Sequence, residues 1–477
     1  MAKVIIIGAG FAGHTAALYL GSALGKKHEI TVVNKYDYFL FIPSLIWVSI
    51  NHMKPEKVHF PLAPVYKKLH VNFVHGSVTE IHPDENYLLV DKANNQGKQK
   101  LEYDYLINAT GPKLNFEATE GLGPHNGHTY SVCTLDHTLQ TRDKVIELFQ
   151  RMKKGESFKI VVGTGHPGAT CQGAAFEFIS NLHKALEKEG IRDKAHLTWL
   201  TNEPELGDFG VHGLKERRGK EIYTSAEYAR EIFEEYDIHW EIQKGVYKVD
   251  EKNIYWEDWD GNKGETPYDF AMLIPQFLGV PMKYVGKDGS DVSSKVVNKA
   301  GLTLVDAIYG LPYDELEKNP DAWPAVYQNP NYPNIFAAGI AFAPPGSISR
   351  PHTNPNGMTI VPAPPRTGMV SGIIGRVVAK NIIDLITKGR MTHKERMTEM
   401  VAACIASMGD SLWDGGAGTM IMYPVVPDNR RYPNEAGRDL FVTHMERGLA
   451  GAWMKRMIHT TFMWKFKGRI GWSIIPE

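Results

Sequence analysis

The sequence is poor in cysteine, has no long apolar run and carries almost no net charge. Its three cysteines, Cys133, Cys171 and Cys404, are too few and too scattered for a disulfide framework or a CxxC metal site, so no metal is predicted. No stretch of about 18 apolar residues is present, which excludes a membrane-spanning helix. The formal net charge of −1 in 477 residues gives no indication of nucleic acid as a partner.

The first residues also lack the features of a signal peptide. They have no basic start, long apolar core or small-residue cleavage site, because glycines interrupt the apolar run. A cytoplasmic body is therefore expected. The length exceeds what one core usually supports and fits two or three domains.

The most informative segment that is present reads VIIIGAGFAG, at residues 4–13. An apolar run is followed at once by Gly8, Gly10 and Gly13 in GxGxxG spacing, and then by a helix-like segment. A strand that feeds such a turn and helix brings backbone N–H groups to a pyrophosphate. A second strand ends at Asn34, where an acid usually binds the ribose; asparagine can still bond a hydroxyl. We predict a dinucleotide site here without assigning it to NAD.

A second strand–glycine unit repeats this pattern in the middle of the chain. Residues 158–162 read FKIVV, apolar except for Lys159, and Gly163, Gly165 and Gly168 follow before a helix and a strand. The repeat predicts an α/β fold with two Rossmann-like dinucleotide-binding domains, the second inserted in the first. The predicted boundaries are 1–113 with 301–390 for the first domain, 114–300 for the second, and 391–477 for a helical C-terminal region.

The last part of the chain, residues 440–477, mixes aromatic and apolar residues with cations. It is too interrupted to span a bilayer, but this composition is typical of a helix lying in the membrane interface. We therefore expect an amphipathic membrane-binding tail. The alternative of helices packed on the body or on another subunit stays open, and the aromatic loop 36–47 is expected to pack beside a cofactor.

Several segments together resemble the sulfide:quinone oxidoreductases among the two-dinucleotide-binding flavoproteins, over nearly the whole chain. They are VIIIGAGFAG, DYFLFIPS at 37–44, SVCTLDH at 131–137, GATCQGAAFEF at 168–178, PNIFAAGI at 333–340 and PPRTG at 364–368. The resemblance implies FAD at the first glycine loop and no nucleotide at the second. It also implies a peripheral (monotopic) enzyme that oxidises sulfide and reduces a membrane quinone, and that could form a homo-oligomer.

The resemblance also assigns the catalytic residues. Cys171 and Cys133 match family cysteines, and His137 matches a histidine that moves protons. HS⁻ attacks a disulfide to give a persulfide and a thiolate, and Cys171 follows a glycine turn at a helix start, where the dipole favours the thiolate. The third family cysteine is missing, because residues 339–342 read Gly-Ile-Ala-Phe. Either Cys133 pairs with Cys171, or Cys404 folds back, or the substrate differs.

The residues expected to bind FAD come from seven segments, and Arg366 would stabilise a reduced, anionic flavin. They are Gly8, Gly10, Phe11, Ala12, Gly13, Asn34, Lys35, Ser44, Val78, Ala109, Thr110, Gly111, Gly339, Arg366, Thr367 and Gly368.

Two other functions fit parts of the pattern. A type II NADH:quinone oxidoreductase shares the fold, the flavin and the tail, and Glu203 lies roughly where a ribose-binding acid would be; Cys171 argues against it. A flavoprotein sulfide dehydrogenase subunit with a haem partner would be periplasmic, and the missing signal peptide and the tail argue against that.

Overall fold

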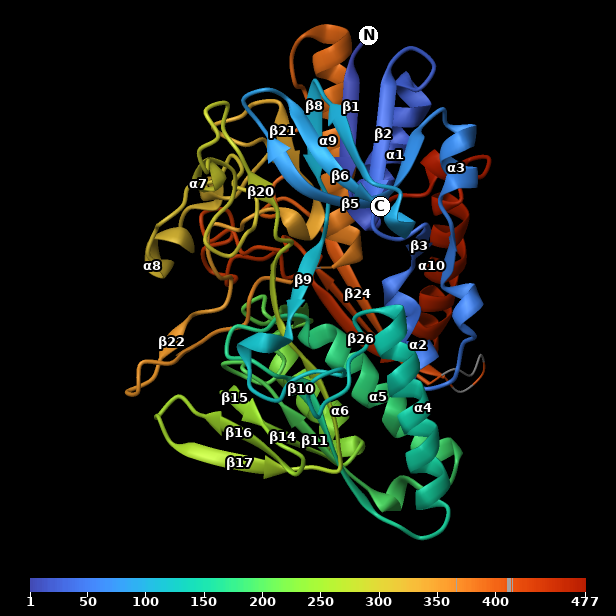
Figure 1. Ribbon diagram of the computed structural model, residues 1–477. Helices are drawn as coiled ribbons and strands as arrows, with labels where there is room; N and C mark the ends of the chain where they lie inside the picture. The colour runs from blue at the N-terminus through green and yellow to red at the C-terminus, as the bar shows by residue number, and fades with distance from the viewer. Residues whose placement is uncertain (366, 410–412, 414) are drawn as a thin grey trace.

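The computed structural model describes residues 1–365, 367–409, 413 and 415–477. Its core consists of a mixed sheet and a wholly parallel sheet, and a strand of each leads into one of the two glycine loops. In Figure 1 the first sheet lies at the top of the molecule and the second at the bottom. The predicted α/β class with Rossmann-type sheets is confirmed.

The first sheet is built around strand β1, which pairs in parallel with β2 and β8. Its residues are aliphatic and mostly buried, as expected for a central parallel strand covered on both faces. Helices α1 (Phe11–Leu24) and α9 (Gly368–Lys388) pack against each other beside it. In spatial order the strands are β21 (Ile335–Ala337), β8 (Tyr105–Asn108), β1 (Lys3–Ile7), β2 (Glu29–Asn34), β5 (Asn72–His82), β6 (Tyr87–Lys92) and β7 (Lys98–Glu102), and β20 (Lys283–Tyr284) also pairs with β5.

The second sheet is wholly parallel. In sequence order, its strands come between β8 and β20 of the first sheet. Its spatial order is β14 (Ile238–Glu241), β11 (Ala195–Leu200), β10 (Phe158–Thr164) and β18 (Phe270–Ile274). Helices α4 (Leu135–Met152), α5 (Gln172–Lys188) and α6 (Ser225–Glu235) accompany it, with a meander of β15 (Gly245–Val249), β16 (Asn253–Glu257) and β17 (Lys263–Pro267) at the lower left of Figure 1. The predicted domain boundaries stay a prediction.

Shorter elements connect these layers. They include β3 (Tyr38–Leu40), α2 (Leu45–Ser49), β4 (His59–Pro61), α3 (Ala63–Lys68), β9 (Pro112–Asn115), β12 (Lys215–Arg218), β13 (Glu221–Thr224), β19 (Gln276–Gly279), α7 (Ser293–Val296), α8 (Tyr313–Leu316), β22 (His352–Thr353) and β23 (Thr359–Ile360). Helix α2 contacts both α4 and α5, so it lies between the starts of two helices of the second sheet.

The C-terminal region differs from the prediction of a helical region. It contains an antiparallel sheet of β24 (Ala402–Met408), β25 (Gly416–Met422) and β26 (His444–Gly448), followed by helix α10 (Leu449–Phe466). The composition argument concerned residues 440–477 only, so it did not reach β24 or β25, and composition does not distinguish strand from helix for β26. The sheet lies between the two Rossmann-type units and contacts α5, α9 and α10 (Figure 1). No helix among the described residues is long and apolar enough to cross a membrane.

Candidate active site

The first glycine loop has the geometry of a phosphate cradle. Gly8 has a φ of +97°, and a Cβ there would overlap the carbonyl oxygen of Ala109, so only glycine fits. A Cβ on Gly13 would overlap Gly8 itself, which lets α1 approach β1. Around Gly10, by contrast, the described part of the chain leaves the space open within 4 Å. Gly10 is also the N-cap of α1, and none of the described side chains caps it, so the helix N-terminus is available to an anion.

Asn34 braces this loop in the structure. Its Oδ1 accepts from the Ala9 N–H at 2.9 Å, and its Nδ2 donates to the Tyr36 carbonyl at 2.7 Å. Both ends of the amide are therefore used by the backbone, and the predicted contact with a ribose stays a prediction. The neighbouring Lys35 is exposed beside it.

Other predicted FAD residues lie around the same edge of the sheet. Ala109 packs on the glycine loop, the Thr110 hydroxyl donates to Asn108 at 2.9 Å, and Gly111 faces open space within the described chain. Two predicted residues have packing roles: Val78 belongs to a buried apolar cluster beside β5, and the Ser44 hydroxyl pairs with His459 Nδ1 at 2.9 Å beneath α10.

The N-terminus of α9 meets that of α1 at this edge. A Cβ on Gly368 would lie 3.0 Å from the Phe11 ring, and one on Gly339 would lie 2.8 Å from the Cβ of Ala12. Thr367, the N-cap of α9, has a buried hydroxyl oxygen that bonds to none of the described groups. Arg366 lies outside the described residues.

These features fit FAD. Within the described part of the chain, two helix N-termini without side-chain caps, an open glycine and a buried hydroxyl without a partner converge on one edge of the first sheet. Buried polar groups in proteins are normally satisfied, so an unsatisfied hydroxyl at a helix N-terminus indicates a polar ligand there.

Cys171 is held close to the start of α9 by the chain around it. It is the N-cap of α5 and has a left-handed backbone, with φ 67° and ψ 33°. A cysteine in this region is uncommon, and such strain clusters at functional sites. The adjacent Thr170 hydroxyl lies 2.8 Å from the Ala363 carbonyl and 3.0 Å from that of Pro364. Because Pro364 precedes Thr367 by three residues, the two loops meet beside the predicted flavin position.

The second glycine loop is covered by the chain itself. Residues 361–364 are termed the crossing segment. The Val361 N–H donates to the Pro167 carbonyl at 3.0 Å, and the Ala363 N–H donates to the Ala169 carbonyl at 3.1 Å. The Gly168 N–H is already bonded to His166 Nδ1 at 2.9 Å. A dinucleotide would have to displace these contacts to reach this loop.

Glu203, at the place of a ribose-binding acid, is also engaged. It is fully buried, and its carboxylate accepts from the Trp199 indole at 3.1 Å, the Thr201 hydroxyl at 2.8 Å and the Phe209 N–H at 2.8 Å. Burial raises its pKa to about 7. Because its oxygens accept hydrogen bonds from these buried groups, the carboxylate does not face a ligand.

Cys133 and His137 lie together where α4 begins. The Cys133 N–H donates to Ser131 Oγ at 3.2 Å, and burial raises the pKa of its thiol. Thr134 caps the helix by accepting from the His137 N–H. Burial, and then the nearby His125, lower the pKa of His137, which favours its neutral form.

Cys404 lies close to the loop that carries Cys171. From the sequence, this was one of three alternatives for the missing third cysteine. Its Sγ lies 3.5 Å from the position that a Cβ on Gly173 would occupy, in the first turn of α5. The neighbouring Ala403 N–H donates to Met369 Sδ at the start of α9, at 3.3 Å. Burial raises the pKa of Cys404 to about 11, and the Lys455 ammonium acts in the opposite direction.

Helix α10 has a face directed to the body and a face directed to solvent. Lys455 and Lys465, expected to meet lipid, instead lie buried in ion pairs, with Glu177 at 3.1 Å and with Glu477 at 2.8 Å. The prediction was wrong for these two cations because each finds a buried carboxylate partner: Glu177 from helix α5 and Glu477 from the end of the chain. The exposed apolar residues are Trp453, Met454, Met457 and Trp464, spaced along one side of the helix.

Comparisons with known proteins agree with this geometry. The family model of the pyridine nucleotide-disulphide oxidoreductases matches residues 2–254. The sulfide-quinone reductase of Aquifex aeolicus (strain VF5) is 32% identical over 440 residues, covering 92% of this chain and 87% of that protein. The X-ray structure of the sulfide:quinone oxidoreductase from Aquifex aeolicus matches with a TM-score of 0.78 and 29% identity, over 98% of this chain and 92% of that one.

A likeness to NDH2 from Plasmodium falciparum, in a structure with NADH, is weaker. Its TM-score is 0.66 at 14% identity, over 99% of this chain and 97% of that one, which shows the shared fold alone. The family match and the Aquifex relative assign the chain more narrowly: it belongs to the sulfide:quinone oxidoreductases, within the pyridine nucleotide-disulphide oxidoreductases.

Proposed function

We propose that this protein is a membrane-associated, FAD-dependent sulfide:quinone oxidoreductase. The observation that carries the proposal is the strained Cys171, tied through Thr170 to the chain that leads into α9, where the Thr367 hydroxyl lies buried without a partner among the described groups. This arrangement brings a sulfur nucleophile to the edge of the first sheet that fits a flavin.

The sulfur chemistry starts from a disulfide between Cys171 and a second cysteine. HS⁻ attacks one sulfur, the old S–S bond breaks as the persulfide S–S bond forms, and the other cysteine leaves as a thiolate carrying the electron pair. The helix N-terminus favours Cys171 as that thiolate. FAD, when bound, takes the two electrons and passes them to a quinone.

We propose Cys404 as the second cysteine. Residues 339–342 contain no sulfur, whereas Cys404 Sγ lies against the first turn of α5, two residues beyond Cys171. Its high pKa makes it the poorer leaving group, so HS⁻ attacks Cys404 and leaves the persulfide there. His137, kept neutral by burial, is the proposed acceptor for the proton that sulfide releases.

An anaerobic titration of the flavin absorbance tests both proposals. Sulfide should bleach the wild-type flavin, and NADH should not, because the crossing segment and Glu203 leave no open nicotinamide site. Bleaching by NADH and not by sulfide would reject the proposed function in favour of the type II NADH:quinone oxidoreductase.

Cysteine variants identify the pair in the same assay. Cys171→Ser and Cys404→Ser should lose reduction by sulfide, while dithionite still reduces their flavin. Cys133→Ser is the matched thiol control. If Cys133→Ser loses the reaction and Cys404→Ser keeps it, the pair is Cys133 and Cys171.

The exposed face of α10 supports binding to the membrane surface, where quinones are dissolved. Trp453, Met457 and Trp464 are 51%, 58% and 43% exposed on one side of the helix, and the cations Lys467 and Arg469 follow it. Tryptophan at headgroup depth and cations against anionic lipid are typical of an in-plane helix. A homo-oligomer that gathers these tails on one face fits the same proposal.

A further inference from the structure

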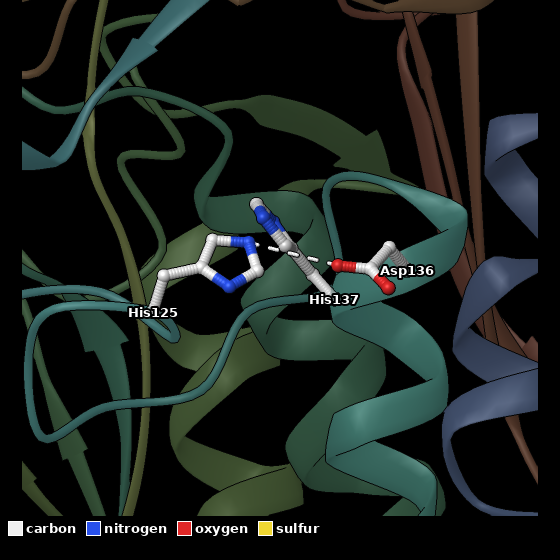
Figure 2. A group of neighbouring side chains, drawn as sticks. All are labelled: His125, Asp136 and His137. Atoms are coloured by element: carbon white, nitrogen blue, oxygen red, sulfur yellow. Dashed lines mark ion pairs between the residues drawn. The ribbon is translucent and has the colours of Figure 1, made fainter.

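A cluster of two histidines and an aspartate lies where helix α4 begins, and it includes His137, the proposed proton acceptor. His125 reaches it from the loop before α4, and Asp136 and His137 come from the first turn of the helix (Figure 2). One donor atom from each side chain lies within 4.8 Å of the others. His125 Nε2 and Asp136 Oδ2 are 3.6 Å apart.

His137 contributes an independent sign of a ligand. The residue is 8% exposed, and its Nδ1 is buried with no hydrogen-bond partner among the described groups. Its ring is fixed between those of Phe116 and His125, with centroids 5.6 and 5.1 Å away. A buried ring nitrogen left unsatisfied costs stability unless something binds it.

We propose that His125, Asp136 and His137 bind one divalent transition-metal ion of the Zn²⁺ type, with water as the fourth ligand. Zinc takes imidazole and carboxylate ligands at about 2.0–2.2 Å in a tetrahedron, which sets ligand atoms about 3.4 Å apart. His125 and Asp136 are exposed and need to move by only about an ångström toward the packed His137. Two nitrogen ligands disfavour Mg²⁺ and Ca²⁺, which prefer oxygen.

Such an ion would act on the enzyme through His137. A metal-bound imidazole nitrogen cannot accept a proton, so the ion would slow sulfide oxidation. This consequence rests on the proposed function, whereas the metal site itself does not.

Calorimetric titration of the holoenzyme with Zn²⁺, in buffer free of sulfide and thiols, tests the site. We expect one ion per chain, with His125→Ala and Asp136→Asn each weakening binding by about tenfold or more. His128→Ala, an exposed histidine of the same loop, is the matched control and should bind as wild type, as should Cys133→Ser. Unchanged binding in His125→Ala and Asp136→Asn, or loss of binding in Cys133→Ser, would overturn the proposal.

A single-turnover measurement separates this proposal from the proposed function. Enzyme loaded with one equivalent of Zn²⁺ should reduce its flavin with sulfide more slowly than metal-free enzyme, and His125→Ala should show no such difference. Zinc bound at the cluster with an unchanged rate would remove His137 from proton transfer and leave the metal site standing.

Discussion

Removing the ammonium of Lys455 should destabilise the protein more than any comparable change at its surface. Lys455 on α10 pairs with Glu177 on α5 at 3.1 Å, and both side chains are less than a tenth exposed. The Ser407 hydroxyl donates to the other carboxylate oxygen. Lys455→Met keeps the length of the side chain and leaves the Glu177 carboxylate buried with the hydroxyl alone.

The magnitude follows from this geometry. Two unit charges 3.1 Å apart interact by about 5 kcal/mol at an effective dielectric constant of about 20. Removing one partner from a buried pair costs about 3–5 kcal/mol, since the remaining charge keeps its desolvation penalty. Replacing both by neutral groups, in Glu177→Gln with Lys455→Met, should recover much of that loss.

Denaturant unfolding of the holoenzyme, with both single variants and the double variant, measures the coupling. Arg447→Met is the control, because Arg447 pairs with Glu235 at a more exposed position, and its loss should cost about 1 kcal/mol or less. If Lys455→Met costs no more than Arg447→Met, the pair does not hold α10 to α5, and the reasoning fails.

Three further predictions concern pH, the glycine loop and the membrane. Burial lowers the pKa of His14 to about 4, below its value of 6.5 in the unfolded chain, so acid protonates the unfolded state first. Stability should therefore fall by about 2 kcal/mol between pH 7 and pH 5, and His14→Phe should flatten that slope in unfolding curves; an unchanged slope would contradict the assignment. Gly8→Ala should lose flavin from the purified protein because its Cβ would strike Ala109, whereas Gly97→Ala, with a φ of +82° and open space around it in the described chain, should keep it; equal occupancy would argue against the cradle. Trp453→Ser and Trp464→Ser should each weaken binding to anionic vesicles, measured by sedimentation, by about seventyfold, from roughly 100 Å² of exposed ring at about 25 cal/mol per Å². Ile308→Ser, 46% exposed elsewhere, is the control, and equal weakening by all three would rule out α10 as the contact.

The features best predicted from the sequence are those that depend on residues close together in the chain. The strand before Gly8, the helix after Gly13 and the position of Cys171 at a helix start follow from runs of a few residues, and the structure has all three. The sheet of β24–β26 was missed although β24 and β25 lie close together in the chain; only the pairing of β25 with β26 spans a longer interval.

For the candidate site too, local patterns predict a general location but not the contacts between distant residues. Glycine spacing and family motifs predict a site at one edge of the first sheet, but no local pattern shows that Asn34 braces the loop or that Cys404 reaches Gly173. Lys455 looked like a lipid contact because its partner Glu177 lies 278 positions earlier. The proximity of His125 to Asp136 and His137 likewise depends on how the intervening loop turns back.

The placement of residues 361–364 limits how this scaffold could be redesigned. Adding a ribose-binding acid after β11 would not be enough to create a nicotinamide site in the second Rossmann-type unit. The backbone of residues 361–364 is already hydrogen-bonded to the second glycine loop. Excising that stretch would also sever the tether of Thr170 and release Cys171 from its position. The same few peptide units thus hold Thr170 and cover the second glycine loop.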